Sequence, residues 1–328
     1  MGRSPLNWSV WGDDMQLFSV IMPKMIYFFI LMVLGFVLAK IRILPRDGLP
    51  TLSALVVKVC LPCLQMGLVF ERGTTFATFA DQKLFALMQL AAYVLLTVLG
   101  IAGAKVFQLR FPQRNSFTGG MVGGNFGFLF IPLILSVLPE FQGYIPVMAA
   151  MDTLYVWTIG LMLYSEGCTQ NREGRSAGTF LKKMINPMLI AILLALTIMS
   201  LRIPLPRQVI DAVTNVGSVS GPVGMMLLGA NICYMSKNLK GTVVPALGFA
   251  VLRQLIAPLL VFLLSRQFLG AEEALLLMLL TGIPTMTTTG LLAIEYHTDV
   301  DFASNLVFVS TLSSLVTMPL TAYISAFL

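Results

Sequence analysis

The sequence predicts an all-α integral membrane protein whose ten transmembrane helices form two inverted repeats of five. Of the 328 residues, 57% are hydrophobic and 11% are charged, whereas soluble domains carry roughly 25% charged residues. The mean hydropathy is +0.87. The apolar residues form runs of about 18–25, and a helix of that length crosses a hydrocarbon core of roughly 30 Å. These observations exclude a soluble enzyme, a nucleic-acid binder and a disordered protein.

The ten predicted spans follow one another with short loops between them. We place them at residues 17–39, 48–69, 83–106, 115–138, 143–165, 183–201, 208–234, 242–265, 272–294 and 301–326. The longest loop, 166–182, separates a first five-helix repeat (1–165) from a second, inverted one (183–328). No loop is long enough to hold a soluble catalytic domain.

The distribution of Lys and Arg predicts the orientation of the chain. If the N-terminus is outside, twelve basic residues fall in or beside inner loops and six in outer segments, and basic residues accumulate on the cytoplasmic side. The inner ones are Lys40, Arg42, Arg46, Lys105, Arg110, Arg114, Arg172, Arg175, Lys182, Lys183, Lys237 and Lys240. We therefore expect a multi-pass protein of the plasma (cell inner) membrane, with a cytoplasmic 166–182 linker and both termini outside. The net charge of +6 has the same origin and does not indicate nucleic acid.

Matching motifs in the two halves predict an internal repeat. Leu44-Pro45-Arg46 opens the second span and Leu205-Pro206-Arg207 opens the seventh, while Pro62 and Pro222 fall within these spans. Gly123-Gly124-Asn125 and Gly282-Ile283-Pro284 interrupt the fourth and ninth spans. Because five spans is an odd number, the second half enters the membrane upside down, as in inverted-repeat secondary transporters.

The fourth and ninth spans cannot be regular helices. Residues 119–132 contain five glycines before Pro132, and the ninth span combines Gly282, Pro284 and several threonines. Unwound backbone at membrane depth occurs only where protein buries it or where it lines a cavity. Breaks at corresponding repeat positions indicate a substrate site, although glycine also permits close helix packing. The predicted substrate-binding residues are Gly124, Asn125, Gly127, Pro284, Thr285, Thr287 and Thr288.

These residues resemble the auxin efflux carrier family. Asn125 to Leu133, NFGFLFIPL, looks like the family's N-x5-I-P-L signature, and Ile283-Pro284 resembles the break in its ninth span. Asn186-Pro187 and residues 227–230 also fit, so the similarity covers nearly the whole chain. The family's crossover asparagine and proline map to Asn125 and Pro284, and Gly124 stands where members have a proline.

The resemblance implies a fold similar to the bile-acid sodium symporters, with broken helices four and nine crossing near the substrate. Plant auxin carriers have a long central loop that this chain lacks. The chain therefore looks like the short prokaryotic type, which is associated with malate, malonate and other organic anions.

Ionisable residues within spans cost about 2.5–3.5 kcal/mol each on insertion scales and require a partner or a function. The candidates for coupling or charge pairing are Asp152, Lys58 and Arg253, with Tyr155 beside Asp152. Asp152 is either a site for a coupling proton or cation, or one half of an ion pair with Lys58 or Arg253. Lys58 is alternatively a partner for an anionic substrate.

We expect a secondary active transporter of small organic anions, such as mono- or dicarboxylates, working by alternating access. H+ and Na+ are both open as coupling ions, uptake and efflux are both open as directions, and the expected partners are the substrate, the lipid bilayer and a second copy in a homodimer. We expect no enzyme activity, no cofactor, no metal and no nucleic acid. The alternative is a membrane receptor or sensor that keeps a transporter fold.

Overall fold

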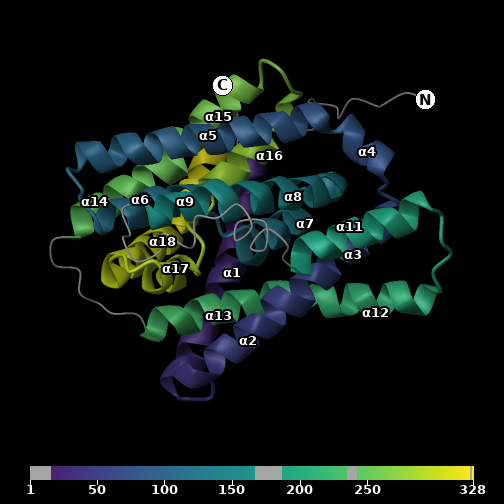
Figure 1. Ribbon diagram of the computed structural model, residues 1–328, viewed down its shortest axis with the longest axis horizontal. Helices are drawn as coiled ribbons and strands as arrows, with labels where there is room; N and C mark the ends of the chain where they lie inside the picture. Colours follow the sequence, from purple (N-terminus) through teal and green to yellow (C-terminus); the bar gives the residue numbers. More distant parts are fainter. Residues whose placement is uncertain (1–15, 167–186, 235–241, 326) are drawn as a thin grey trace.

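Helices make up the regular structure of the described part of the chain (Figure 1). A computed structural model describes residues 16–166, 187–234, 242–325 and 327–328. Most of the predicted linker and the first residues of the sixth span lie outside these ranges. Within them, the isolated bridge between Gly124 and Thr285 is the one β-type pairing.

The first half contains the following segments. In chain order they are α1 (Gln16–Lys40), η2 (Arg46–Gly48), α2 (Leu49–Leu55), η3 (Val56–Cys60), α3 (Leu61–Arg72), α4 (Phe76–Asp81), α5 (Lys83–Val106), α6 (Gln113–Val122), η4 (Phe126–Phe130), α7 (Ile131–Val137), η5 (Pro139–Tyr144), α8 (Ile145–Tyr155), η6 (Val156–Gly160) and α9 (Leu161–Ser165).

The second half is described from Pro187 onward. Its segments are α11 (Pro187–Ser200), α12 (Arg207–Ser218), α13 (Ser220–Tyr234), α14 (Val243–Val251), η9 (Leu252–Ile256), α15 (Ala257–Ser265), α16 (Ala271–Gly282), α17 (Thr289–Glu295) and α18 (Val300–Ser325).

Seven helical stretches in the described residues are long and apolar enough to cross a membrane. They are Ile21–Lys40, Arg46–Arg72, Lys83–Val106, Pro139–Ser165, Arg207–Tyr234, Val243–Ser265 and Val300–Ser325. Two shorter apolar stretches, Phe126–Val137 and Pro187–Ser200, fall where the fourth and sixth spans are predicted. A multi-pass membrane protein is thus confirmed, whereas the count of ten and the inverted repeat stay predictions.

Prolines account for three short π-helical segments inside long helices. The segments η3, η4 and η9 each end two residues before a proline, at Pro62, Pro132 and Pro258. Proline has no backbone N–H and its ring clashes with the carbonyl four residues earlier. A wider i→i+5 turn relieves this clash, and such turns are frequent at functional sites.

The helices pack as two groups. The first helix group consists of α1, α2, α3, α11, α12 and α13: α1 packs along α13, while α11 and α12 pack against α3. The second helix group contains α5–α9 and α14–α18: α5 packs on α6, α15 on α16, and α14 and α17 on α18. Contacts of α1 with α18 and of α13 with η4 join the groups.

Two glycines allow α1 and α13 to approach backbone to backbone. A Cβ atom on Gly35 would clash with the Met226 carbonyl of α13, and one on Gly229 with the Met32 carbonyl of α1. Apolar burial does not drive helix association in lipid, so close packing at small residues takes its place.

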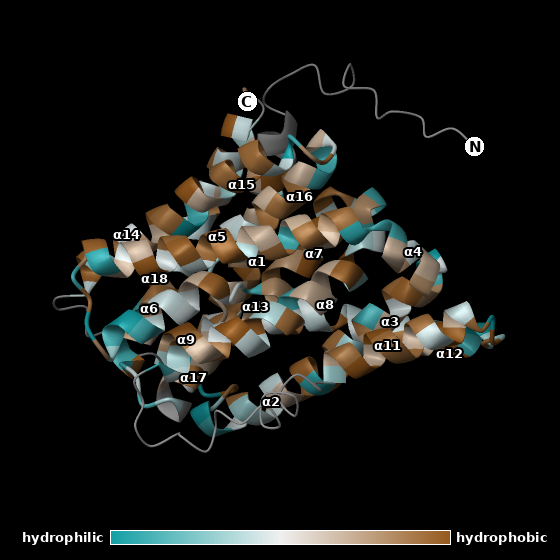
Figure 2. Cartoon of the chain, turned by 45° about the horizontal axis from the view of Figure 1, so that its top comes forward, coloured by the Kyte–Doolittle hydropathy of each residue, from teal (hydrophilic) through white to brown (hydrophobic). Residues whose placement is uncertain are grey.

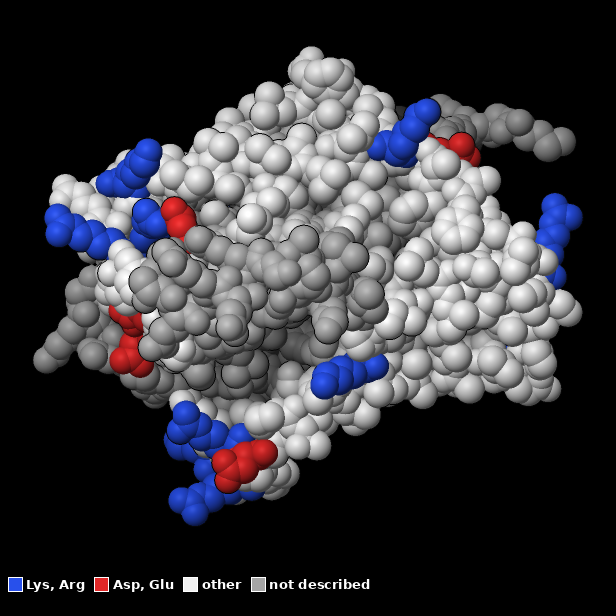
Figure 3. All heavy atoms as spheres, viewed as in Figure 1, with Lys and Arg blue, Asp and Glu red and all other residues white. Residues whose placement is uncertain are grey.

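The polarity of the molecule suits a bilayer. Large apolar side chains are exposed on both helix groups, and these face outward. Examples are Ile30 (59% exposed), Leu87 (59%), Val244 (69%) and Val316 (64%). Figure 2 shows hydrophobic residues, in brown, along most of the helices. The charged side chains in Figure 3 gather toward the edges of the visible face. Polar side chains such as Gln65, Gln89 and Arg253 are instead buried inside.

We predict that Gly229→Val destabilises the protein by about 1–3 kcal/mol or more, because overpacking forces the two backbones apart. The melting temperature of the purified protein in detergent measures this change. Gly143→Val is the matched control, since a Cβ on Gly143 meets no atom within 4 Å. Equal melting temperatures for the two variants would contradict the close-packing role of Gly229.

Candidate functional site

The two predicted helix breaks lie against each other and pair through their backbones. The N–H of Asn125 donates to the Pro284 carbonyl at 2.9 Å, and the N–H of Met286 donates to the Gly123 carbonyl at 3.0 Å. These bonds form the antiparallel bridge between Gly124 and Thr285. The unwound segments therefore satisfy each other's polar groups, as backbone at membrane depth must. We call residues 123–125 and 283–286 the crossing.

The local sequence explains why the ninth-span helix stops at Gly282. Pro284 cannot donate to the preceding turn, and it restricts the residue before it to extended conformations. Ile283 accordingly has φ −64° and ψ 152°. The helix resumes at Thr289, whose N–H donates to the Met286 carbonyl.

Thr285 holds the crossing together from the second break. Its side chain is fully buried, and its hydroxyl donates to the carbonyls of Gly120 and Gly123 at 2.9 and 3.0 Å. Its backbone N–H donates to Ser310 Oγ at 3.3 Å. Thr285 thus caps the carbonyl end of α6, an end whose last carbonyls have no partner within the helix.

Arg253 joins the carbonyl ends of both broken helices. It lies in the π segment η9 and is only 1% exposed. Its Nε donates to the Ile283 carbonyl at 2.9 Å, and its Nη1 donates to the carbonyls of Gly120, at 3.3 Å, and Met121. A helix end with free carbonyls carries a partial negative charge, so the guanidinium neutralises the ends of α6 and α16 together.

Gly124 is required by this arrangement. A Cβ atom there would lie 2.7 Å from both Arg253 Nη2 and Ile283 Cδ1. Any larger residue would push the guanidinium off its carbonyl partners. Gly124 therefore serves the close approach of Arg253 to the crossing.

Asn125 offers the one unpaired buried side-chain donor at the crossing among the described residues. It is 3% exposed, and its Nδ2 has no hydrogen-bond partner. Buried polar atoms are nearly always paired, so an unpaired one requires an explanation. A ligand that accepts a hydrogen bond at Asn125 provides one.

The other predicted binding residues have different positions. Pro284 is buried and uses its carbonyl within the crossing. Gly127 lies in η4, where a Cβ would come within 2.6 Å of Leu61 on α3. Thr287 and Thr288 are half-buried, and neither hydroxyl bonds to another described residue. Asn125, Thr287 and Thr288 thus have polar groups available to a ligand, whereas those of Thr285 are used within the protein.

Asp152 belongs to a polar cluster between α5 and α8. Its Oδ1 accepts a 2.6 Å hydrogen bond from the Tyr93 hydroxyl. Gln89 donates to Tyr93 Oη at 3.4 Å and to the Met148 carbonyl at 2.9 Å. Tyr155 stacks on Tyr93 with ring centroids 5.3 Å apart, and its hydroxyl lies 3.0 Å from Thr97 Oγ1.

The structure pairs Asp152 with a tyrosine, and not with either of the two cations that the sequence left open as partners. Within the described ranges, Asp152 forms no ion pair with Lys58 or Arg253, and its close partner is Tyr93. Lys58 is exposed in η3.

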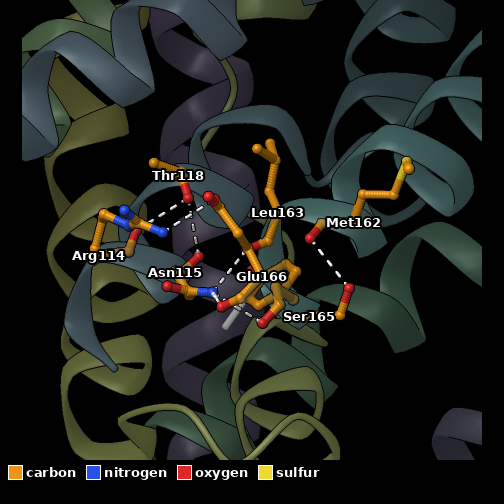
Figure 4. A network of polar contacts seen from close by, with 8 residues as sticks. Arg114, Asn115, Thr118, Met162, Leu163, Ser165 and Glu166 are labelled. Atoms are coloured by element: carbon orange, nitrogen blue, oxygen red, sulfur yellow. Dashed lines mark hydrogen bonds and ion pairs between the residues drawn. The ribbon is translucent and has the colours of Figure 1, made fainter. Parts of the chain in front are cut away.

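A second polar network holds the beginning of α6 (Figure 4). Asn115 Nδ2 donates to the carbonyls of Leu163, Tyr164 and Glu166 at 3.0, 3.2 and 2.6 Å, and so caps α9. Arg114 forms an ion pair with Glu166 at 3.1 Å. The half-helix that ends at the crossing is therefore anchored at its other end as well.

Three buried side chains of this structure were not predicted from the sequence. Tyr93 and Gln89 complete the Asp152 cluster, and Gln65 on α3 is fully buried with neither amide atom paired to a described residue. The sequence could have indicated the two glutamines, because each is a polar residue within an apolar span. Tyr93 gave no such signal, because tyrosine is common in spans.

The comparison with known families now decides the identity of the chain. A family model described as "Membrane transport protein" matches residues 20–322. The chain belongs to this family. The match confirms the resemblance to the auxin efflux carriers and establishes a membrane transporter. It is a family of transporters and not of enzymes. No curated protein matches the chain significantly.

We predict that Arg253→Lys destabilises this family member by about 1.5–3 kcal/mol, the cost of losing a hydrogen bond to a charged donor. Lysine keeps the charge but is a point charge without the planar fork that bridges two carbonyl ends. A thermal melt of purified protein measures the change. The control is Arg266→Lys at the end of α15, where the side chain is exposed. A melting temperature of Arg253→Lys that is no lower than that of the control would contradict the role of Arg253 in bridging the two helix ends.

Proposed function

We propose that the chain is a secondary active transporter that moves small organic anions, such as mono- or dicarboxylates, by alternating access. The observation that carries this proposal is the buried, unpaired Nδ2 of Asn125 at the crossing. A carboxylate oxygen accepts hydrogen bonds only, and therefore suits a free N–H donor. Thr287 and Thr288 supply further hydroxyl donors on the chain after the second break.

The helix ends at the crossing support an anion over a cation. Each break creates one carbonyl end, which is partly negative, and one N–H end, which is partly positive. Arg253 bonds the carbonyl ends of α6 and α16. The N-terminal ends of the segments that begin at Phe126 and Thr289 are not neutralised in this way, although the N–H groups of these two residues themselves donate to the carbonyls of Gly124 and Met286.

The arrangement of the spans supports alternating access. We infer ten spans in two inverted repeats. Two observations support this inference: the two helix breaks pair with each other, and the proline of each Leu-Pro-Arg motif, Pro45 and Pro206, is the N-cap of a helical segment. The crossing belongs to the second helix group, which meets the first through α18 and η4. Rocking of one group against the other would expose the crossing to each side in turn.

We favour protons as the coupling ion. In broken-helix carriers, Na+ binds at unwound carbonyls and carbonyl ends of half-helices, and here Arg253 occupies that role. Asp152, bonded to Tyr93, is a carboxyl group able to gain and lose a proton. The inferred location is the cell inner membrane with both termini outside, as the basic loops indicate.

Replacement of Asn125 by alanine should weaken substrate binding by about 1.5–3 kcal/mol, the cost of a lost hydrogen bond to a charged group. Thermal shifts of the purified protein against a panel of mono- and dicarboxylates measure binding, because a ligand stabilises the state that it binds. Asn215→Ala, on the exposed surface of α12, is the control. If the ligand raises the melting temperature of both variants equally, Asn125 does not contribute to substrate binding.

Asp152→Asn should abolish uptake driven by a pH gradient but leave exchange of labelled for unlabelled substrate across proteoliposomes. The amide keeps the hydrogen bond to Tyr93 but cannot carry a proton. Asp211→Asn is the control, since Asp211 is in an exposed ion pair with Arg207. Gradient-driven uptake by Asp152→Asn at the wild-type rate, or uptake by the wild type that requires sodium, would refute proton coupling at Asp152.

A further inference from the structure

We propose that a basic pocket at the end of α1 binds the phosphate headgroup of an anionic phospholipid. The pocket has a volume of about 390 Å³ and lies between the turn after α1, the beginning of the second span and the end of α13. Lys40, Arg42 and Arg46 line it together with Cys233 and Tyr234. We call it the α1-end pocket. It is separate from the crossing and does not depend on the transported substrate.

The charges of the α1-end pocket suit a phosphate. Lys40, Arg42 and Arg46 are exposed, and none of them forms an ion pair with another described residue. Arginine binds phosphate through paired N–H groups, and lysine binds it as a point charge. Asp47 follows in the chain but does not line the pocket. The charged group at the lower edge of Figure 3 lies where α1 ends and α2 begins in Figure 1.

The backbone of the pocket is fixed by contacts between the two helices. The Tyr234 hydroxyl, from α13, donates to the carbonyls of Ala39 and Leu44 at 2.9 and 2.8 Å. Within the turn, the N–H of Arg42 donates to the Ala39 carbonyl at 3.0 Å, and the N–H of Leu44 donates to the Leu38 carbonyl at 3.1 Å. The basic side chains therefore project from a built turn at the junction of α1 and α13.

The surface of α1 identifies a lipid as the source of the phosphate. Ile26, Val33 and Lys40 are spaced by seven residues and so share one face of the helix. Ile26 and Val33 are each 46% exposed, whereas the opposite side of α1 packs along α13. An acyl chain along this face would lead to the pocket at the point where the apolar span ends. Basic pockets between helices at the membrane surface are typical sites for anionic headgroups.

Protection of Cys233 from a thiol reagent tests the proposal directly. Cys60→Ser, Cys63→Ser and Cys168→Ser together leave Cys233 as the single cysteine. The full-length protein in detergent is treated with a maleimide alone, with phosphatidylglycerol, with phosphatidylcholine of the same acyl chains, or with soluble glycerol phosphate. Phosphatidylglycerol at about ten times its dissociation constant should slow labelling about tenfold, and the other two additions should not.

Charge variants of the single-cysteine protein show whether the basic residues of the α1-end pocket cause the protection of Cys233. Arg42→Gln with Arg46→Gln should remove the protection by phosphatidylglycerol. Lys105→Gln with Arg110→Gln removes two exposed basic residues elsewhere on the predicted inner side and should keep it. Native mass spectrometry of both double variants counts retained phosphatidylglycerol, and gel filtration verifies that each is folded.

Three results would overturn the proposal. Equal protection by phosphatidylcholine would show that acyl chains alone cover Cys233. Equal protection by glycerol phosphate would show a site for soluble phosphates and not for a lipid. Retained protection in Arg42→Gln/Arg46→Gln, or its equal loss in the Lys105→Gln/Arg110→Gln control, would show that the α1-end pocket does not bind the headgroup.

Discussion

The architecture depends on how two helix breaks satisfy their backbone groups inside a membrane. The carbonyls of Gly120, Met121 and Ile283 have no water to bond to in hydrocarbon, and each unpaired group would cost several kcal/mol. Arg253 bonds all three, while Thr285 and the paired backbones bond the remainder of the crossing. A single buried cation therefore makes both breaks compatible with the bilayer. The glycine at 124 leaves the space that this cation needs.

The same requirement explains how the surrounding helices are built. Proline widens the helix at η9, the turn that carries Arg253, and at η4, the turn that follows Asn125. Asn115 and Arg114 fix the far end of α6 against α9. Because α6, α9, α16 and α18 all belong to the second helix group, the crossing is held within one packed body. This supports a motion in which the crossing moves as a unit against α1 and α13.

The sequence predicted the breaks better than their chemistry. Glycine and proline restrict the backbone locally, so Gly123 to Asn125 and Pro284 marked the crossing without any structure. The bonds of Arg253 and Thr285 run to backbone carbonyls, which no residue type reveals. The sequence alone therefore predicts a charge pair for Arg253 and substrate binding for Thr285. Tyr93 lies 59 residues from Asp152 in the chain, and only packing of α5 on α8 brings them together.

The electrostatics of the crossing bear on the proposed anionic substrate. Two broken helices present two partly negative carbonyl ends and two partly positive N–H ends, each worth roughly half an elementary charge. Without a further charge these four ends would balance, and neither ion would be preferred. The guanidinium of Arg253 cancels the two negative ends, because it bonds their carbonyls. The beginnings of η4 and α17 are not neutralised by this cation, although the N–H groups of Phe126 and Thr289 donate to Gly124 and Met286, and the Asn125 amide nitrogen is unpaired. The bonds from Arg253 to both carbonyl ends therefore support the proposal that the crossing binds an anion.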